Sequence, residues 1–278
     1  MTFLDADYSA IEARITPWLA GQEDALQEYR LQDAATTPEE KFLRCRYRIQ
    51  AAEIYRIPVA SVTNHPHRFV GKFTILGCGF GMGPPKFRES VQKYGYTMPE
   101  GLEVTAVQSW RQKHKKVVSY WYDMERAAKN AILHPGSVYA CREKIKFMVR
   151  DVEGMPFLLM RLPSGRKLAY PKPRLCGDRI AFFGNTIGTN WGDVSTWGGK
   201  LVENAVQAVA ADVMAHGSHN AEREGYEIAT LVHDEAICYH KEGQTSEEFV
   251  RLLTDLPEWA SGLPIAAEGE VTPFYRKS

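Results

Sequence analysis

The sequence predicts an α+β protein, in which a mostly helical segment interrupts a sheet domain. Two observations support this class. Short apolar segments typical of strands lie near both ends of the chain, at residues 2–7 and from residue 145 onwards. The residues between them are rich in charge and have the pattern of helices. The simplest architecture is a sheet domain whose chain leaves to build a helical insert and then returns.

The first half of the chain is expected to contain one strand and several helices. Residues 2–7 form the strand, and a helix follows from about Ser9, with a kink at Pro17. Residues 22–60 are expected to be helical, with a break at residues 36–38. Further helices are expected from residues 64–66 to the glycine-rich residues 79–85, and, as two or three segments, over residues 86–139.

The second half is expected to alternate strands and one long helix. A Pro-Ser-Gly turn at residues 163–165 joins two strands in a hairpin. A helix follows over residues 200–224, and a second hairpin over residues 228–239 has its turn at residues 233–235. The predicted apolar face of the long helix consists of Val202, Val206, Val209 and Val213.

The composition excludes several classes of protein. Hydrophobic residues make up 44% of the 278 residues, which is enough for a core and excludes general disorder. The formal net charge is +0, so any surface that binds a polyanion must be local. The five cysteines form no CxxC pair, which disfavours a zinc site or a disulfide framework. No apolar run reaches the ~20 residues that span a bilayer, so we expect a soluble cytoplasmic protein without a membrane partner.

Three carboxylates lie where strands are expected to end. Asp7 ends the first strand, and Asp234 and Glu235 lie in the turn of the last hairpin. Buried carboxylates repel one another, and a divalent cation such as Mg²⁺ or Mn²⁺ is the common remedy. Asp5 has the same strand parity as Asp7, so spacing alone does not distinguish the two. The alternative interpretation is that these acids are ordinary solvated turn residues.

A four-residue spacing predicts one stripe along a helix. The stripe consists of Arg68, Lys72, Leu76 and Phe80. Its cationic half could hold a triphosphate, and its apolar half could pack on a sugar and a base. Gly77, Gly79 and Gly81 would leave space for a close approach to the backbone. The alternative is an exposed cationic face above an ordinary core turn.

Three segments in order resemble the motifs of family A (polymerase I-like) DNA polymerases of the bacteriophage type. Residues 7–14 resemble motif A, DYSxIExR; residues 68–81 resemble motif B, RxxxKxxxFGxxYG; residues 232–235 match motif C, VHDE. Further resemblance to phage members lies in residues 162–166, 198–204 and 274–277. The resemblance implies a palm formed by residues 1–21 and 145–278, with its antiparallel sheet, and helical fingers formed by residues 22–144. The family's thumb and exonuclease precede motif A, and we expect them to be absent here.

The resemblance assigns the carboxylates. Asp7 and Asp234, with the backbone carbonyl of Tyr8, would hold two Mg²⁺ ions, for which Mn²⁺ could substitute. Glu235 would be an accessory acid of the catalytic site. The choice of Asp7 over Asp5 comes from this alignment and not from the spacing.

The same resemblance assigns substrate contacts. Arg68 and Lys72 would contact the incoming triphosphate, and Lys72 could protonate the departing pyrophosphate. Leu76 and Phe80 would pack on the nucleotide. Leu76 replaces the aromatic residue usual in motif B, and Phe80 replaces the usual tyrosine. Arg14 would brace the substrate site.

Glu12 has two interpretations. Ser9 and Glu12 have the spacing of a capping box at the start of a helix. The family resemblance instead makes Glu12 a steric gate that excludes a ribose 2′-hydroxyl, with the help of the Phe80 ring. The gate implies deoxynucleoside triphosphates as substrates.

Contacts to DNA are expected on the second half of the chain. Gln207 and His233 match family residues near the primer–template. The matching hairpin of the family lies near the duplex, so the cations around the predicted hairpin are expected DNA contacts: Arg161, Arg166, Lys167, Lys172 and Arg174. The basic residues 110–116 could follow template phosphates, but such a run is commonly a solvated helix face.

The resemblance implies a template-directed DNA polymerase that extends a primer by two-metal-ion nucleotidyl transfer in an infected bacterial host. A separate N-terminal chain carrying the thumb and exonuclease is an expected partner. The first alternative is a catalytically weak DNA-binding subunit that needs a partner chain. An RNA polymerase or reverse transcriptase, and a two-metal nuclease, are further alternatives; Glu12 argues against the former and motif B against the latter.

Overall fold

The computed structural model describes residues 2–186 and 190–275, which form two compact units. Unit 1 contains Met1–Ile15 and Val206–Ser278, and unit 2 contains Thr16–Ala205. The boundaries lie inside two helices, α1 (Ile11–Ala20) and α9 (Gly198–Arg223). They differ from the boundaries expected between palm and fingers, which are functional divisions and stay a prediction.

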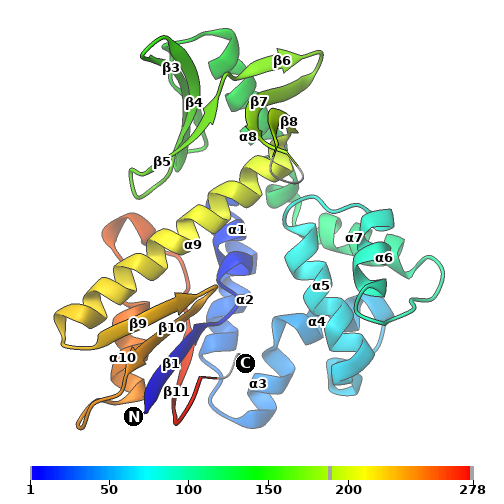
Figure 1. Cartoon of the computed structure of the whole chain (residues 1–278). Coiled ribbons are helices and arrows are strands. Elements are labelled where there is room, and N and C mark those ends of the chain that lie inside the picture. Colours follow the sequence, from blue (N-terminus) through cyan, green and yellow to red (C-terminus); the bar gives the residue numbers. More distant parts are fainter. Residues whose placement is uncertain (1, 187–189, 276–278) are drawn as a thin grey trace. The chain divides into compact units, whose positions relative to one another are not determined.

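Unit 1 is built on a four-stranded antiparallel sheet with the order β11-β1-β10-β9 (Figure 1). Its strands are β1 (Phe3–Tyr8), β9 (Glu227–Val232), β10 (Glu235–Tyr239) and β11 (Ala267–Thr272). Leu4, Ala6 and Tyr8 are buried on one face. The helix α10 (Ser246–Thr254) covers this face, since the Tyr8 hydroxyl donates to the Leu253 carbonyl at 2.7 Å. The expected first strand and last hairpin are therefore present.

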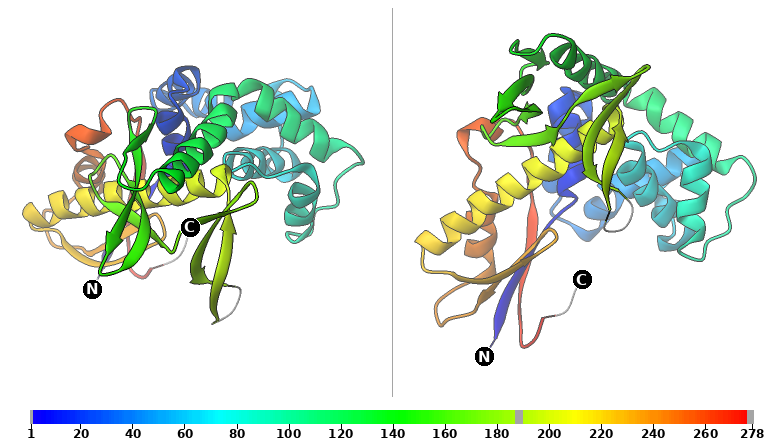
Figure 2. Two further views of the ribbon diagram at one scale, coloured as in Figure 1. Left: turned by 90° about the horizontal axis from the view of Figure 1, so that it is seen from above. Right: turned by 45° about the horizontal axis from the view of Figure 1, so that its top comes forward.

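Unit 2 contains two smaller antiparallel sheets, which we call sheet B and sheet C. Sheet B consists of β2 (Tyr139–Cys141), β3 (Ile145–Val152), β4 (Met155–Arg161) and β5 (Lys167–Pro171). Sheet C consists of β6 (Arg174–Cys176), β7 (Arg179–Asn185) and β8 (Trp191–Thr196). The predicted hairpin around residues 163–165 is the connection between β4 and β5. Figure 2 shows sheet C as a long hairpin with one short added strand.

The remaining elements of unit 2 are helices, as the charged and breaker-rich sequence predicts. They are α2 (Glu23–Asp33), α3 (Pro38–Arg44), α4 (Arg46–Tyr55), α5 (Phe69–Cys78), α6 (Pro84–Gln92), α7 (Leu102–Lys113) and α8 (Lys115–Leu133), with short turns η1 (Val59–Ser61) and η2 (Asn64–Arg68); unit 1 adds η3 (Glu258–Ala260). None of the helices in the described residues has both the length and the apolar character needed to cross a membrane.

Local sequence signals explain several of these helix ends. Thr37 caps the start of α3 with a capping box. The Thr37 hydroxyl accepts a hydrogen bond from the Glu40 amide, and the Glu40 carboxylate accepts one from the Thr37 amide. Gly83 precedes two prolines at the start of α6. The predicted helix start near residue 64 is confirmed, because the short π-helix η2 begins at Asn64, with extended dihedral angles at His65, and the regular helix α5 follows from Phe69.

The carbonyls that follow α5 receive side-chain donors from neighbouring helices. The Trp121 indole donates to the Gly79 carbonyl at 2.9 Å, and Arg111 donates to the Met82 carbonyl at 3.3 Å. Helix ends leave such carbonyls without intrahelical partners. The end of the motif B segment is therefore tied to α7 and α8.

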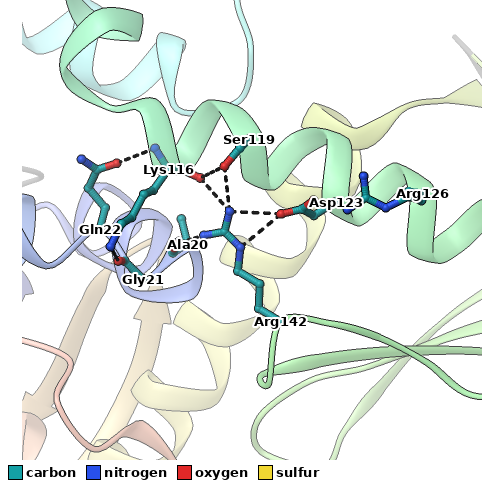
Figure 3. Close-up of polar contacts among 8 residues, drawn as sticks. All are labelled: Ala20, Gly21, Gln22, Lys116, Ser119, Asp123, Arg126 and Arg142. Atoms are coloured by element: carbon teal, nitrogen blue, oxygen red, sulfur yellow. Dashed lines mark hydrogen bonds and ion pairs between the residues drawn. The ribbon is translucent and has the colours of Figure 1, made fainter.

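Arg142 joins three elements of unit 2 (Figure 3). Its guanidinium donates to the carbonyl of Ala20, at the end of α1, and to the Lys116 carbonyl at 3.2 Å in α8. It also donates to Ser119 Oγ at 2.8 Å and to Asp123 Oδ2 at 3.1 Å. Arg142 lies in the turn between β2 and β3. Its side chain supplies a hydrogen-bond donor both to a carbonyl at the end of α1, which has no partner within the helix, and to an acid of α8.

We predict that Arg142→Gln lowers the free energy of unfolding by about 2–3 kcal/mol, because a charged hydrogen-bond hub is lost and partly buried acceptors are left unpaired. Urea unfolding followed by circular dichroism measures the change.

Arg126→Gln is the matched control, because Arg126 pairs with the same Asp123 but is largely exposed. An exposed ion pair contributes about 0–1 kcal/mol. Equal destabilisation by the two variants would contradict the role assigned to Arg142.

Candidate functional site

The face of the unit 1 sheet that the helices do not cover carries acidic residues. Side chains alternate between the faces of a strand. Because Leu4 and Tyr8 point to the helices, Asp5 and Asp7 point to the opposite face. Asp5 is 9% exposed and Asp7 is partly exposed. Both acids therefore lie on one face, as their parity predicts.

The strand register brings three acids into line. Asp7 lies directly opposite Glu235 of β10 and Glu268 of β11. Residues directly opposite in antiparallel strands have Cβ atoms roughly 4.5–5.5 Å apart and share a face. Glu235 is almost fully buried, at 3% exposure, so water screens its charge poorly. We call Glu268, Asp7 and Glu235 the carboxylate row.

Asp234 is brought to the end of this row by a backbone hydrogen bond. It lies with His233 in the turn between β9 and β10, where His233 has a φ of 56°. The Tyr8 amide donates to the Asp234 carbonyl at 3.0 Å. The structure therefore brings together Asp7 and Asp234, which lie near opposite ends of the sequence.

Burial, with crowding by other acids, raises the pKa of Asp5 and of Asp7. Burial, followed by repulsion from Asp234 and Glu235, raises the pKa of Asp7 to about 7. Burial, followed by repulsion from Glu235 and Glu270, raises the pKa of Asp5 to about 6. The folded chain then holds protons that an unfolded aspartate releases near 3.8. The stability of the fold consequently falls as the pH rises from 3.8 to about 7.

The carboxylate oxygens of this site are suitable ligands for a divalent cation whose remaining ligands come from water or a substrate. Carboxylate oxygens suit Mg²⁺ or Mn²⁺. Among the residues that the structure describes, no group of three or more His, Cys, Asp or Glu side chains is arranged to hold a metal by itself. Mg²⁺ commonly takes one or two protein carboxylates and completes its shell with water and substrate phosphates. Asp7 and Asp234 are candidate ligands of that kind.

Tyr275 contacts the buried member of the carboxylate row, which the sequence did not predict. Its hydroxyl donates to Glu235 Oε2 at 2.5 Å, and this bond raises the pKa of Tyr275 to about 12. The hydrogen bond compensates part of the Glu235 charge. Arg276 and Lys277, which complete the phage-like segment at residues 274–277, lie outside the described residues.

The segment after β1 corrects one expectation. The first helical bond of α1 runs from the Arg14 amide to the Ala10 carbonyl at 3.2 Å, so Ala10 and not Ser9 occupies the N-cap. The Ser9 amide donates to the Ala266 carbonyl at 2.9 Å. The helix therefore begins one residue later than the capping-box interpretation of Ser9 and Glu12 requires.

Arg14 lies buried beneath this segment. Its side chain has no exposed surface, and its Nε donates to the Ser9 carbonyl at 2.6 Å. A second nitrogen lies 3.5 Å from the Pro264 carbonyl. These contacts favour the bracing role in the prediction over a direct contact with a substrate.

In unit 2, Arg68 and Lys72 both lie near the ring of Tyr47, which belongs to α4. The Arg68 guanidinium lies 5.3 Å from the centre of the Tyr47 ring, and the Lys72 ammonium lies 6.0 Å from it. Lys72 is exposed, and Arg68 is partly buried. Both cations lie within about 6 Å of the centre of one ring, and cation–π attraction to that ring keeps them near each other. The four-residue spacing thus produces the predicted cationic pair, and Tyr47 is a neighbour that the spacing did not reveal.

Close packing of α4 on α5 positions this pair. A Cβ on Gly71 would lie 2.1 Å from the Tyr47 carbonyl oxygen, so only glycine permits this approach. Arg48 also fixes the chain before α5, since it donates to the Val62 carbonyl and to Asn64 Oδ1, both at 2.5 Å.

The apolar half of the stripe is only partly as predicted. Leu76 and Phe80 are both partly buried. The space expected beside the glycines is filled by protein side chains: a Cβ on Gly77 would lie 2.9 Å from Met82, and a Cβ on Gly81 would lie 2.2 Å from Trp197. These two glycines therefore serve internal packing, not the approach of a ligand.

The basic residues 110–116 are engaged within unit 2. Lys113 pairs with Glu28 at 3.3 Å and with Glu53 at 2.6 Å. His114 is buried, and burial lowers its pKa to about 4, so it is neutral at pH 7. These contacts favour a structural role for the segment over a path for template phosphates.

The predicted DNA contacts on sheet B form a row of cations. Arg161 lies directly opposite Lys146 on one side and Lys167 on the other, and all three are exposed. Like charges directly opposite one another destabilise a sheet. None of the three makes an ion pair within the described part of the chain. Arg166 is also exposed, in the turn that joins the two strands.

The remaining predicted DNA contacts are in unit 1. Gln207 is exposed on α9, on the side opposite the buried Val206 and Val209. His233 is exposed in the turn beside Asp234. Both side chains are accessible, as a contact with DNA requires.

The comparisons with known proteins agree with this architecture. No protein-family model matches the sequence. A DNA polymerase of Bacillus phage SP02 is 34% identical over 283 residues, which cover 99% of this chain and 41% of that protein. The POL domain of Pol1 from M. smegmatis, solved in complex with a DNA primer-template and dNTP, matches with a TM-score of 0.61 and 16% identity over 98% of this chain and 40% of that one. The fold is that of a polymerase domain.

The chain is similar over nearly its whole length to a bacteriophage DNA polymerase, and the predicted resemblance to a DNA polymerase of the phage type is confirmed to that extent. It spans about two fifths of the length of that relative, 41%. The α+β class with antiparallel sheets is also confirmed.

We predict that Gly71→Ala lowers the free energy of unfolding by about 1–3 kcal/mol, the usual cost of overpacking. Alanine has a higher helix propensity than glycine, so any loss of stability in this variant would come from the clash with Tyr47. Thermal unfolding measures the change.

Gly83→Ala is the matched control, because the nearest atom to its new Cβ lies 4.0 Å away and its φ of −91° suits any residue. A Gly71→Ala variant as stable as the control would contradict the close packing of α4 on α5.

Proposed function

We propose that this chain catalyses template-directed DNA synthesis, adding deoxynucleotides to a primer 3′ end. The observation that carries the proposal is the pairing of Asp7 with Glu235, with the Asp234 turn bonded to Tyr8. Asp7 and Glu235 lie on paired strands with Asp234 in the adjoining turn, and burial, followed by repulsion from Asp234 and Glu235, raises the pKa of Asp7 to about 7. Strain of this kind is typical of functional sites. The relation to a phage DNA polymerase supports the assignment.

Asp7 and Asp234 would hold two Mg²⁺ ions, or Mn²⁺ in their place, with the carbonyl of Tyr8 as a further ligand. When bound, such ions lower the pKa of an attacking hydroxyl and stabilise a leaving oxygen. Glu235, held by Tyr275, would keep negative charge close to these ligands. The two aspartates would orient the primer hydroxyl toward the α-phosphate.

Arg68 and Lys72 would bind the triphosphate of the incoming nucleotide. A guanidinium can bind phosphate oxygens as a fork, and an ammonium acts as a point charge. Lys72 is exposed and could supply the proton that pyrophosphate takes up as it leaves. Leu76 and Phe80 would contact the nucleotide beyond the phosphates.

Primer-template DNA is the proposed partner of the accessible cations and amides. Arg161, Arg166 and Lys167 would contact phosphates, and Lys146 joins them because it lies in the same row. Gln207 and His233 would contact the primer–template near the nascent pair. A phosphate backbone would relieve the repulsion within the cation row.

A separate chain that carries a thumb and an exonuclease is a further proposed partner; this chain matches 41% of the length of the phage relative. Co-purification from the native source tests this partner. The rival function, DNA binding without catalysis, predicts template binding but no extension with either Mg²⁺ or Mn²⁺.

We predict that Asp7→Asn and Asp234→Asn each reduce primer extension by roughly 10³-fold or more, since each removes a charge from the metal site. Extension of a labelled primer with Mg²⁺ measures the effect.

Asp5→Asn is the matched control, on the same strand and face but opposite Ile237 and Glu270. We expect it to retain most activity, and Mg²⁺ to raise the melting temperature of this variant and of the wild type more than that of Asp7→Asn. Full activity of Asp7→Asn would remove the basis of the assignment.

We predict that Glu12→Ala increases the incorporation of ribonucleotides relative to deoxynucleotides by roughly tenfold or more, the discrimination typical of one lost steric or polar contact. Paired extension assays with the two nucleotide types measure the ratio. Glu12→Gln, which keeps the volume, should keep most of the discrimination. An unchanged ratio in Glu12→Ala would return Glu12 to a structural role at the start of α1.

A further inference from the structure

Sheet C has one packed face and one open face. The packed face includes Ile180, which is 1% exposed, and Phe182, whose ring meets Tyr170 of β5 edge-on at 5.1 Å. Paired positions and alternate residues share a face in an antiparallel sheet. Arg179 and Phe183 have the opposite parity, and Trp191 lies opposite Asn185. These residues therefore belong to the open face, where the small Ala181 is buried at 3% exposure and the larger side chains are exposed or partly buried.

Two aromatic rings lie together on this open face. The Phe183 and Trp191 rings have centroids 5.9 Å apart and planes inclined by 31°. Trp191 is 65% exposed, which is unusual for the largest apolar side chain. Phe183 is only partly buried. The pair thus presents a flat apolar surface to solvent.

Cations lie beside these rings and further along the same face. The Lys172 ammonium lies 5.1 Å from the centre of the Phe183 ring. Arg174 forms an ion pair with Asp193, which lies directly opposite Phe183, and Arg179 is exposed near the start of β7. Three cations and one acid give this face an excess of positive charge. The face therefore complements a ligand that has both flat apolar groups and negative charges.

We propose that the open face of sheet C, defined by Lys172, Arg174, Arg179, Phe183 and Trp191, binds single-stranded nucleic acid by base stacking. Unpaired bases stack on exposed aromatic rings, and their phosphates pair with nearby cations. Bases in a duplex are already stacked and do not offer their faces to a ring. The inference rests on the proposed function only in naming the unpaired template as the occupant, and none of these residues belongs to the proposed catalytic site.

Trp191 would supply the principal stacking surface and Phe183 a second one. The Lys172 ammonium would remain near the Phe183 ring while contacting a phosphate, since the ring attracts a cation without neutralising it. The partial pairing of Arg174 with Asp193 keeps its guanidinium on the strand face. A strand of unpaired nucleotides would thus lie across β7 and β8.

The test measures binding and does not depend on catalysis. Fluorescence anisotropy of a labelled oligodeoxythymidine of about 20 nucleotides is recorded with the full chain in EDTA, without nucleotides. Removing one stacked ring costs a factor of roughly ten in affinity, so Trp191→Ala should bind about tenfold more weakly. Trp191→Phe should recover most of the affinity. Lys172→Gln should lower the slope of log affinity against log salt by roughly 0.7.

Tyr122→Ala is the matched control, because Tyr122 is also 65% exposed but lies on α8. It should bind the oligonucleotide as the wild type does. A blunt duplex of the same length should bind equally to the wild type and to Trp191→Ala. Thermal unfolding of each variant checks that the exposed substitutions leave the fold intact.

Three results would overturn the inference: no binding of the single strand by the wild type, unchanged binding by Trp191→Ala, or equal losses for single strand and duplex. Unchanged binding by Trp191→Ala would instead favour a protein as the partner of the exposed rings. The proposed function fails by a different observation, full activity of Asp7→Asn, and the same anisotropy assay on that variant still reports on sheet C.

Discussion

The fold of unit 1 depends on one constraint, the register between β1 and its two neighbours. Because Asp7 is directly opposite both Glu235 and Glu268, the backbone hydrogen bonds that stabilise the sheet also fix three carboxylates on one face. A one-residue slip would turn Asp7 into the helix-covered face and Tyr8 out of it. Tyr8 prevents such a slip from both sides, since its hydroxyl is bonded to Leu253 and its amide to Asp234. The packing of Tyr8 in the core therefore holds the three carboxylates together in spite of their mutual repulsion.

Unit 2 contains a similar row of like charges aligned by strand register, but its charges are positive. Lys146, Arg161 and Lys167 are aligned by the register of sheet B, as the three acids are aligned in unit 1. Solvent screens the exposed cations, whereas Glu235 is buried and needs the Tyr275 hydroxyl. Each row costs stability in the isolated chain and gains a partner only when a counter-charge binds. A cation suits the acidic row, and a polyanion suits the basic row.

Sequence reasoning predicted the parts of the fold that have a strong local signal. The strand β1, the hairpin around Asp234, the long helix α9 and the stripe of Arg68 and Lys72 follow from apolar periodicity and from breakers. The strand β11 was not predicted, because Ala267–Thr272 alternates glutamate and glycine without an apolar run and forms only by pairing with β1. The Tyr275 contact depends on a tertiary approach that no spacing encodes. The exact start of α1 also depends on a tertiary contact, because the Ser9 amide bonds to the Ala266 carbonyl and the first helical bond is accepted by the Ala10 carbonyl.

The choice between Asp5 and Asp7 shows how structure adds to sequence. Parity makes the two acids equivalent, and both are crowded enough for their pKa values to rise. Their neighbours differ, because Asp5 lies opposite Ile237 while Asp7 lies opposite Glu235 and near the Asp234 turn. Asp5 is 9% exposed, so a cation would have to lose most of its water to reach it, whereas Asp7 is more open at the strand end. In the proposed site, position along the strand would thus separate a carboxylate that a hydrated ion could share with a phosphate from one that would only raise the negative potential behind it.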